Sequence, residues 1–424
     1  MEISLCFCGD VLISKRLPHM FEEGIYNYFQ QHDCRFGNLE TTIHRREGYP
    51  AAFPGGGYAM ADPRCLKDLK NLGFNLFSTA NNHAMDYSCN GLIATMKYLQ
   101  EYDIPFSGTG INLSDASKPA YVECSGGRVA LISVTSSFHD SYAAGPQNQE
   151  MQGRPGVAPL RHAAIYDLDE KNYDDLCRIA KDSGINAYHD MGIRTGYLTA
   201  VSNLRFGPYQ FRKGERNEVH TTPNKEDLQR TINVVKDTKG HSDVVIVSIH
   251  THQMLGSDES RNPEFVSIFA KECVNAGANI VVCHGSHRLR GIEVYKEGII
   301  FHGLGNFIFQ HELVDYCPEE LYNRYGLTRQ SSTGPEELFR VRSKNGTIGA
   351  KTMPDCYRSV IASVKYKDGS METSLVPVEI DVSTGLPQIT KDISILERLE
   401  QLSETYHTKI ILDKDKAKGY IYAN

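Results

Sequence analysis

The chain has 424 residues, of which 40% are hydrophobic and 23% charged, and this composition is typical of a soluble globular protein. Its 45 basic and 52 acidic residues give a net charge of −7, which excludes the basic surplus expected of a nucleic-acid-binding protein. No stretch reaches the roughly 18 uninterrupted apolar residues of a membrane span, and the N-terminus lacks the pattern of a signal peptide. The 11 cysteines are scattered without a Cys-x-x-Cys pair, which predicts reduced thiols. These features predict a cytoplasmic protein with no membrane span and no nucleic-acid partner.

Strand-like and helix-like patterns alternate along most of the chain, which predicts an α/β fold. The expected strands are residues 3–8, 74–77, 121–123, 129–134, 243–249, 278–283, 291–295, 299–302, 306–309, 359–367 and 372–380. The expected helices are residues 63–72, 91–102, 172–181, 224–237, 264–275 and 392–406, with Asn224 as an N-cap and Gly277 as a terminator.

Two stretches interrupt this alternation. Residues 136–222 contain long loop-like segments and one expected helix, so we interpret them as an insertion or lid, and residues 316–355 form a similar break. The chain is therefore expected to contain one main domain over residues 1–385, followed by a helical tail over residues 386–424.

Polar side chains stand at the ends of three strand patterns. Asp10 follows the first strand, His250 and His252 follow the strand ending at residue 249, and His284 and His287 follow the strand ending at residue 283. Sites in open α/β sheets form at the carboxyl ends of strands, so these groups are expected to converge. Imidazoles and carboxylates together suit a first-row divalent metal ion.

Three further segments could complete such a site. Glu40 is a candidate second carboxylate, although alone it reads as a surface glutamate. Asn82 offers an amide oxygen and His83 a proton donor, but the same segment is equally consistent with an Asx-rich turn. Arg290 could hold a substrate anion, and the alternative is a solvated arginine after a turn.

The sequence resembles the CapA family, named for capsule poly-γ-glutamate synthesis, within the calcineurin-like metallophosphoesterases. The matching segments are Phe7-Cys-Gly-Asp10, Gly37-Asn-Leu-Glu40, Ser78-Thr-Ala-Asn-Asn-His83, Ser248-Ile-His250, Cys283-His-Gly-Ser-His287, Arg290-Gly-Ile-Glu-Val-Tyr295 and Phe301-His-Gly-Leu-Gly-Asn-Phe-Ile-Phe309. They span residues 3 to about 310.

The resemblance implies a metallophosphoesterase-like four-layer αββα sandwich of two mixed sheets over residues 1–385, with C-terminal strands and a helix. It implies one or two divalent ions, manganese, iron or zinc, held by Asp10, Glu40, Asn82, His250, His284 and His287. The same resemblance suggests His83, Asp10 and His287 as catalytic residues, and Arg290, His252 and Asn81 as substrate contacts. One departure matters: Leu12 stands where the broader phosphoesterases have a histidine ligand, which weakens the case for a full two-metal site.

Three functions are consistent with this resemblance. The first is a metal-dependent hydrolase acting on a phosphoester or on a γ-glutamyl or other peptide-type bond of a small molecule, peptide or polymer. The second is a peptide Cα-epimerase that uses acid–base residues with little or no metal. The third is a non-enzymatic subunit of capsule synthesis, which the missing N-terminal anchor disfavours. A homodimer remains open.

Overall fold

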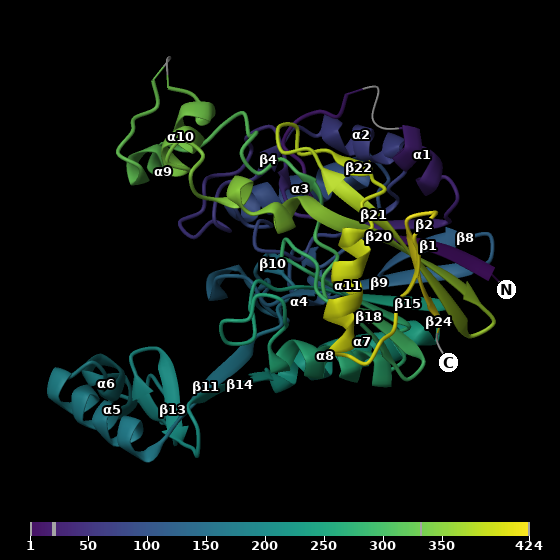
Figure 1. Cartoon of the computed structure of the whole chain (residues 1–424). Helices are drawn as coiled ribbons and strands as arrows, with labels where there is room; N and C mark the ends of the chain where they lie inside the picture. The colour runs from purple at the N-terminus through teal and green to yellow at the C-terminus, as the bar shows by residue number, and fades with distance from the viewer. Residues whose placement is uncertain (1, 19–22, 331–332, 423–424) are drawn as a thin grey trace.

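The computed structural model describes residues 2–18, 23–330 and 333–422. Two large mixed sheets dominate it, and helices cover their outer faces (Figure 1). The first sheet contains β1 (Glu2–Leu12), β2 (Cys34–Leu39), β5 (Leu76–Ser78), β6 (Phe106–Ser107), β19 (Asn306–Phe309), β20 (Arg358–Lys367), β21 (Ser370–Ile380), β22 (Pro387–Ile389), β23 (Ile411–Asp413) and β24 (Lys418–Tyr422). The second contains β8 (Ala120–Cys124), β9 (Gly127–Thr135), β15 (Val244–His250), β16 (Ile280–His284), β17 (Ile292–Tyr295) and β18 (Gly298–Phe301).

Strand order explains why both sheets are mixed. In the first sheet β1, β2, β5 and β6 run parallel, whereas β20 and β21 are antiparallel to their neighbours. In the second sheet β9, β15, β16 and β18 run parallel, and β8 and β17 are antiparallel edge strands. The parallel strands of each sheet therefore end together at one edge.

Side chains of β1 point alternately to the two faces of the first sheet, so they belong to two different layers of the core. Leu5 and Phe7 belong to the cluster between the two sheets, together with residues of β9, β15 and β16. Cys6 and Cys8 point to the opposite face, where they pack with the helices. Because successive side chains of a strand alternate between faces, an unbroken apolar strand fills two layers at once.

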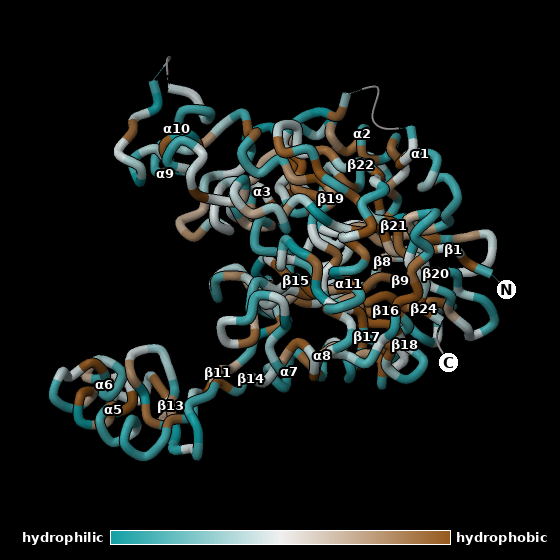
Figure 2. The backbone as a smooth tube through the Cα atoms, viewed as in Figure 1, coloured by the Kyte–Doolittle hydropathy of each residue, from teal (hydrophilic) through white to brown (hydrophobic). Residues whose placement is uncertain are grey.

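Helices form the two outer layers. The first sheet is covered by α1 (Glu23–Phe29), α2 (Arg64–Leu72) and α3 (Ser88–Glu101), and the second by α7 (Lys225–Lys239) and α8 (Glu264–Asn275). The predicted αββα sandwich is therefore confirmed, and the apolar tube segments gather within it (Figure 2). Asn224 caps α7 as expected, since its Oδ1 accepts from Asp227 N at 3.0 Å. Short elements complete the fold: β3 (Thr42–Ile43), β4 (Met60–Ala61), β7 (Thr109–Gly110), β10 (Gly156–Val157), α4 (Leu113–Ala116), α9 (Glu319–Arg324) and α10 (Pro335–Arg342).

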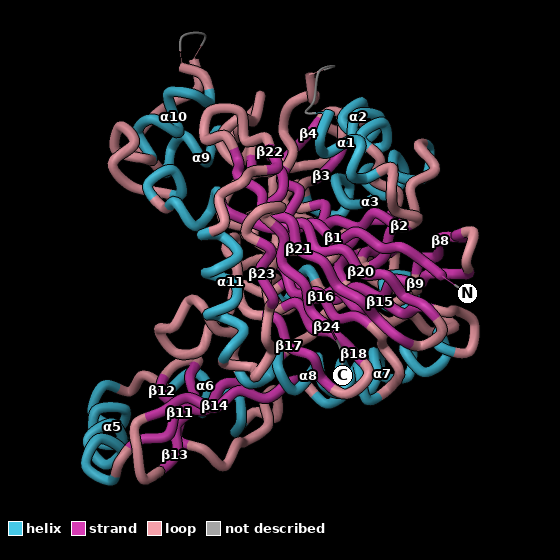
Figure 3. Tube along the Cα trace, turned by 45° about the vertical axis from the view of Figure 1, so that its right-hand side comes forward, coloured by secondary structure: helices cyan, strands magenta, loops and turns pink. Residues whose placement is uncertain are grey.

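The expected insertion has different bounds in the structure. Ala158 and Leu160 belong to the core under the second sheet, so residues 136–161 are part of the main body. The following segment forms a lobe that extends from the body (Figures 1 and 3). It contains β11 (His162–Leu168), α5 (Glu170–Ser183), α6 (Ala187–Arg194), β12 (Leu204–Phe206), β13 (Tyr209–Lys213) and β14 (Glu218–Pro223). Its four-stranded sheet, in the order β12-β13-β11-β14, and α6 were not predicted from the sequence.

The expected helical tail is also mixed. The helix α11 (Ser394–Glu404) places Ile395, Leu396 and Leu399 in the cluster between the sheets, and it packs against β17, β20 and β21. The strands β22 and β24 pair with β21, so the chain after residue 385 extends the first sheet. The segment predicted as a helical tail therefore contains short strands beside its helix, because β21 offers an edge with which they can pair.

Candidate functional site

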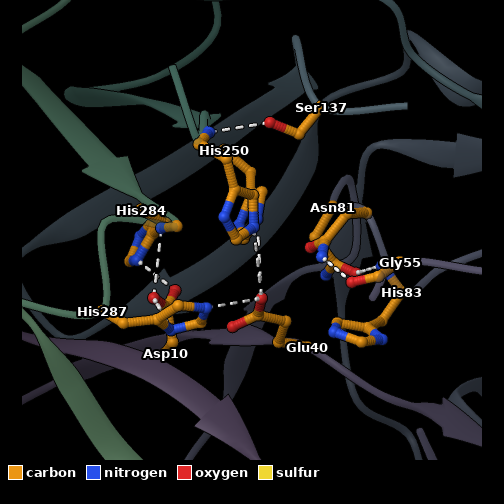
Figure 4. Close-up of polar contacts among 12 residues, drawn as sticks. Asp10, Glu40, Gly55, Asn81, His83, Ser137, His250, His284 and His287 are labelled. Atoms are coloured by element: carbon orange, nitrogen blue, oxygen red, sulfur yellow. Dashed lines mark hydrogen bonds and ion pairs between the residues drawn. The ribbon is translucent and has the colours of Figure 1, made fainter. Parts of the chain in front are cut away.

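The predicted polar residues meet where the carboxyl ends of both sheets come together (Figure 4). Asp10 lies near the end of β1, Glu40 directly follows β2, and Asn82 follows β5, all in the first sheet. His250 and His284 are the last residues of β15 and β16 in the second sheet. Parallel strands bring residues far apart in the chain to one edge, as expected for an α/β protein.

Close backbone packing fixes Asp10 in this site. Its amide donates to Gly305 O at 3.0 Å, and a Cβ on Gly9 would lie only 1.9 Å from the same oxygen. On the other side, Gly285 N donates to Asp10 Oδ2 at 3.1 Å. Gly285 has φ of 91°, and a Cβ there would lie 2.8 Å from His250 Nε2. Glycine is therefore required at both positions for the strands to approach.

Glu40 belongs to two groups of potential metal ligands. Its Oε1 is 3.8 Å from His287 Nε2, 3.5 Å from His250 Nε2 and 3.9 Å from His252 Nε2. Asp10 completes the first group, with Oδ2 at 3.6 Å from His287 Nδ1. Asp10–Glu40–His287 and Glu40–His250–His252 each place three ligand atoms within 4.8 Å of one another. The arrangement could hold two ions bridged by one carboxylate.

Several buried polar atoms of this cluster have no hydrogen-bond partner among the described residues. They are both oxygens of Glu40, Oδ1 of Asn82 and both ring nitrogens of His284. Asn82 is oriented by its amide, which donates to Gly55 O at 2.7 Å, and His284 Nδ1 lies 3.2 Å from Asp10 Oδ1. Buried polar groups are normally paired, and oxygen and imidazole nitrogen atoms suit manganese, iron or zinc. The donor set therefore fits a divalent cation.

The electrostatics of the cluster agree with this fit. Burial would raise the pKa of Asp10, but the neighbouring His284 lowers it well below its ordinary value, so Asp10 is ionised. Burial, followed by the charge of Asp10, raises the pKa of Glu40 far above its usual range. Burial lowers the pKa of His250, and it lowers that of His252 to about 3. Burial therefore keeps His250 and His252 neutral, and a cation beside Glu40 would favour the charged form of this carboxyl group.

Two asparagines that sequence reasoning did not single out support the cluster. Asn38 Nδ2 donates to Asp10 Oδ1 at 2.8 Å and lies 3.1 Å from His250 Nδ1. His287 Nδ1 donates to Asn306 Oδ1 at 2.9 Å, which leaves Nε2 facing Glu40. Such outer partners orient metal ligands. Both asparagines lie inside the segments that resemble the CapA family, and this position in the sequence could have indicated their role.

His83 is held by its own set of hydrogen bonds beside the cluster. Its Nδ1 donates to Asp86 Oδ2 at 2.6 Å, and its backbone amide donates to Asn81 Oδ1 at 3.1 Å. The carboxylate of Asp86 also accepts from Gly55 N at 2.8 Å and from Ala59 N at 2.7 Å. The pairing with Asp86 leaves Nε2 of His83 free to exchange a proton.

Comparison with known proteins identifies the family. The family model for the bacterial capsule synthesis protein PGA_cap matches residues 4–311. The chain belongs to this family. It is 32% identical to "Uncharacterized protein y4sH" of Sinorhizobium fredii, over 96% of this chain and 90% of that protein. It is 24% identical to "PGA biosynthesis protein CapA" of Bacillus subtilis (95% and 82%) and 25% identical to "Capsule biosynthesis protein CapA" of Bacillus anthracis (73% and 60%).

Two residues predicted to contact the substrate, Asn81 and Arg290, form hydrogen bonds to other groups of the protein. Asn81 Nδ2 donates to Leu39 O at 2.8 Å and its Oδ1 accepts from His83 N, so Asn81 builds the turn. Arg290 is buried, and its guanidinium donates to Glu259 O at 3.1 Å, to Asn262 and to Gln253 O at 3.3 Å. These contacts assign Arg290 to anchoring the loop 253–262 that follows His252.

His252 itself remains accessible in this PGA_cap-family site. Its side chain is 36% exposed, and its backbone amide donates to Ser137 Oγ at 2.7 Å. Five of the ligand candidates predicted from the family resemblance lie together, as drawn in Figure 4: Asp10, Glu40, His250, His284 and His287. Among the described residues, no helix is long and apolar enough to cross a bilayer.

Proposed function

We propose that the protein is a metal-dependent hydrolase of a phosphoester or of a γ-glutamyl or other peptide-type bond. One observation carries the proposal: Glu40 is fully buried, its two oxygens lack hydrogen-bond partners among the described residues, and it belongs to both groups of potential ligands. A cation would supply the charge that this carboxylate lacks. The chain belongs to a capsule-synthesis family, which is consistent with a substrate that is a γ-glutamyl polymer.

The proposed ligands are those that converge on the site. They are Asp10, Glu40, Asn82, His250, His284 and His287, with His252 as a further ligand or substrate contact. When bound, a divalent ion such as manganese, iron or zinc would acidify water and polarise the oxygen of the scissile group. Asp10 is ionised and His250 is neutral, so each offers a free electron pair without prior loss of a proton.

His83 is the proposed proton donor to the leaving group. The carboxylate of Asp86 accepts from Nδ1 at 2.6 Å, which orients the ring of His83 with Nε2 on the opposite side. Transfer from Nε2 would neutralise the leaving oxygen or nitrogen, and Asp86 would hold the ring in one orientation throughout.

The test joins metal content to activity. Elemental analysis of the purified protein is expected to find a transition metal, and a generic phosphodiester and a γ-glutamyl peptide are the two substrates to assay. Chelation and His250→Ala should each abolish hydrolysis, whereas His241→Ala, which changes an exposed histidine of a remote turn, should leave it unchanged. Full activity after chelation, or in His250→Ala, would contradict the proposal.

A peptide Cα-epimerase is the second candidate, and one observation favours it. Leu12 stands at the position of a phosphoesterase ligand and is buried among apolar residues such as Phe309 and Tyr357, so it contributes no donor. Asp10, His83 and His287 would then act as acid–base groups. Incubating candidate peptides with the protein in deuterium oxide would reveal exchange at Cα, and no uptake would count against epimerisation.

A further inference from the structure

The lobe formed by residues 162–223 lacks a hydrophobic core of its own. Every residue in this range is described, and Ala180 is the only hydrophobic side chain that is almost completely buried, at 6% exposed. No hydrophobic cluster of the described residues draws a member from the lobe. A unit of about 60 residues is marginally stable even with a good core. The lobe therefore needs another surface to cover its apolar groups.

The apolar groups it exposes gather around α6. The α6 patch consists of Ile185 (44% exposed), Tyr188 (81%), Met191 (42%), Tyr197 (87%) and Leu198 (45%). Tyr188 and Met191 lie three residues apart on α6 and are therefore neighbours on its surface, and Ile185 lies just before the helix begins. Tyr197 N and Leu198 N donate to Gly192 O at 2.9 and 3.1 Å, so the turn after α6 folds back against the helix.

The main body of the same chain does not cover this patch. The lobe is joined to the body through β11 and β14, and β14 packs against α8, where Thr221 N donates to Glu264 Oε2 at 2.8 Å. The helices α5 and α6 lie beyond this stalk, on the part of the lobe that extends outward (Figure 1). The covering surface must therefore come from another molecule.

We infer that the α6 patch is a dimerisation surface for a second copy of this chain. A two-fold interface sets a patch against itself, so a strongly charged patch would repel its own image. The lobe carries nine acidic and eight basic residues between positions 162 and 223, and its net charge of −1 allows self-association. Because acidic and basic residues of the lobe nearly balance, the lobe does not attract a polyanionic partner electrostatically.

The exposed area is of the right order for such a dimer. Two nearly free tyrosines can each bury about 150 to 250 Å², and the whole patch offers several hundred Å². A standard interface buries about 800 Å² per partner, so the patch would form its apolar centre. Tyrosine is also among the residues that dominate interface energetics.

The experiment measures the mass of the full chain in solution by light scattering and sedimentation velocity at micromolar concentrations. Wild type is expected to be a dimer, and the double variant Tyr188→Asp with Tyr197→Asp a monomer, with a rise of about 30-fold or more in the dimer dissociation constant. Tyr49→Asp is the matched control, because Tyr49 is 74% exposed but lies outside the lobe. Circular dichroism and metal content report whether each variant keeps its fold.

Four outcomes would overturn the inference. The first is a wild-type chain that is monomeric throughout the concentration range. The second is a double variant that dimerises as tightly as wild type, since the dimer would then use another face. The third is a monomer whose sedimentation changes when poly-γ-glutamate is added, with no such change in the double variant, since the patch would then bind polymer. A lost dimer in Tyr49→Asp alone would likewise contradict it. None of these results depends on hydrolytic activity.

Discussion

Replacing Glu40 by glutamine tests the proposed metal site directly. Glutamine keeps the shape of the side chain but removes the charge that both potential ligand groups share. Loss of an outer partner of a metal ligand commonly costs about 10- to 100-fold in affinity, so loss of a bridging carboxylate should cost at least about 100-fold. Glu40→Gln is therefore expected to lose bound metal while remaining folded.

The expected size of the effect follows from linkage. An ion present at about 100 times its dissociation constant stabilises the folded state by about 2.7 kcal/mol. Unfolding entropy of about 2.1 cal/mol/K per residue gives about 0.9 kcal/mol/K for a chain of 424 residues. Metal should therefore raise the melting temperature of wild type by about 3 °C and leave that of Glu40→Gln unchanged, as measured by differential scanning calorimetry.

The same variant should change the pH dependence of the metal-free protein. Burial raises the pKa of Glu40 above its ordinary value of 4.5, so above that pH the folded state holds a proton that the unfolded chain releases. This contribution to stability is lost as pH rises. The difference in melting temperature, variant minus chelated wild type, should therefore increase between about pH 5 and about pH 8. A metal-independent melting temperature in wild type, or a pH-independent difference, would refute the reasoning.

Three further substitutions separate chemistry, positioning and packing. His83→Gln should lower turnover by about 10²- to 10⁴-fold with unchanged metal content, which steady-state kinetics and elemental analysis would measure. Arg290→Gln should release the loop after His252 and weaken ion binding by about 10- to 100-fold in calorimetric titration. Arg288→Gln is its control, because a partly exposed ion pair contributes little. Leu5→Ala should lower the free energy of unfolding by about 2 to 5 kcal/mol in urea titration, because Leu5 is fully buried between the sheets.

Local sequence patterns determined most strands and helices of this protein and the positions of its ligand candidates, and the family resemblance supplied the four layers. Apolar runs such as that of β1 define strands buried on both faces, and each run ends in a polar residue such as Asp10, His250 or His284. Parallel strands must align their carboxyl ends, so these residues could be placed together without knowing any contact. Glu40 was included among the ligand candidates because it lies in a segment that resembles a family motif.

Tertiary structure alone decided which partner each polar group finds. Arg290 stands beside the histidine pair in the sequence, yet its guanidinium turns to Asn262 on a different loop. Asn38 links Asp10 to His250 only because two sheets meet there. The strands after residue 385 and the sheet of the lobe are short, and short strands form only where an edge is available to pair with. Such choices depend on segments distant in the chain, and no local pattern encodes them.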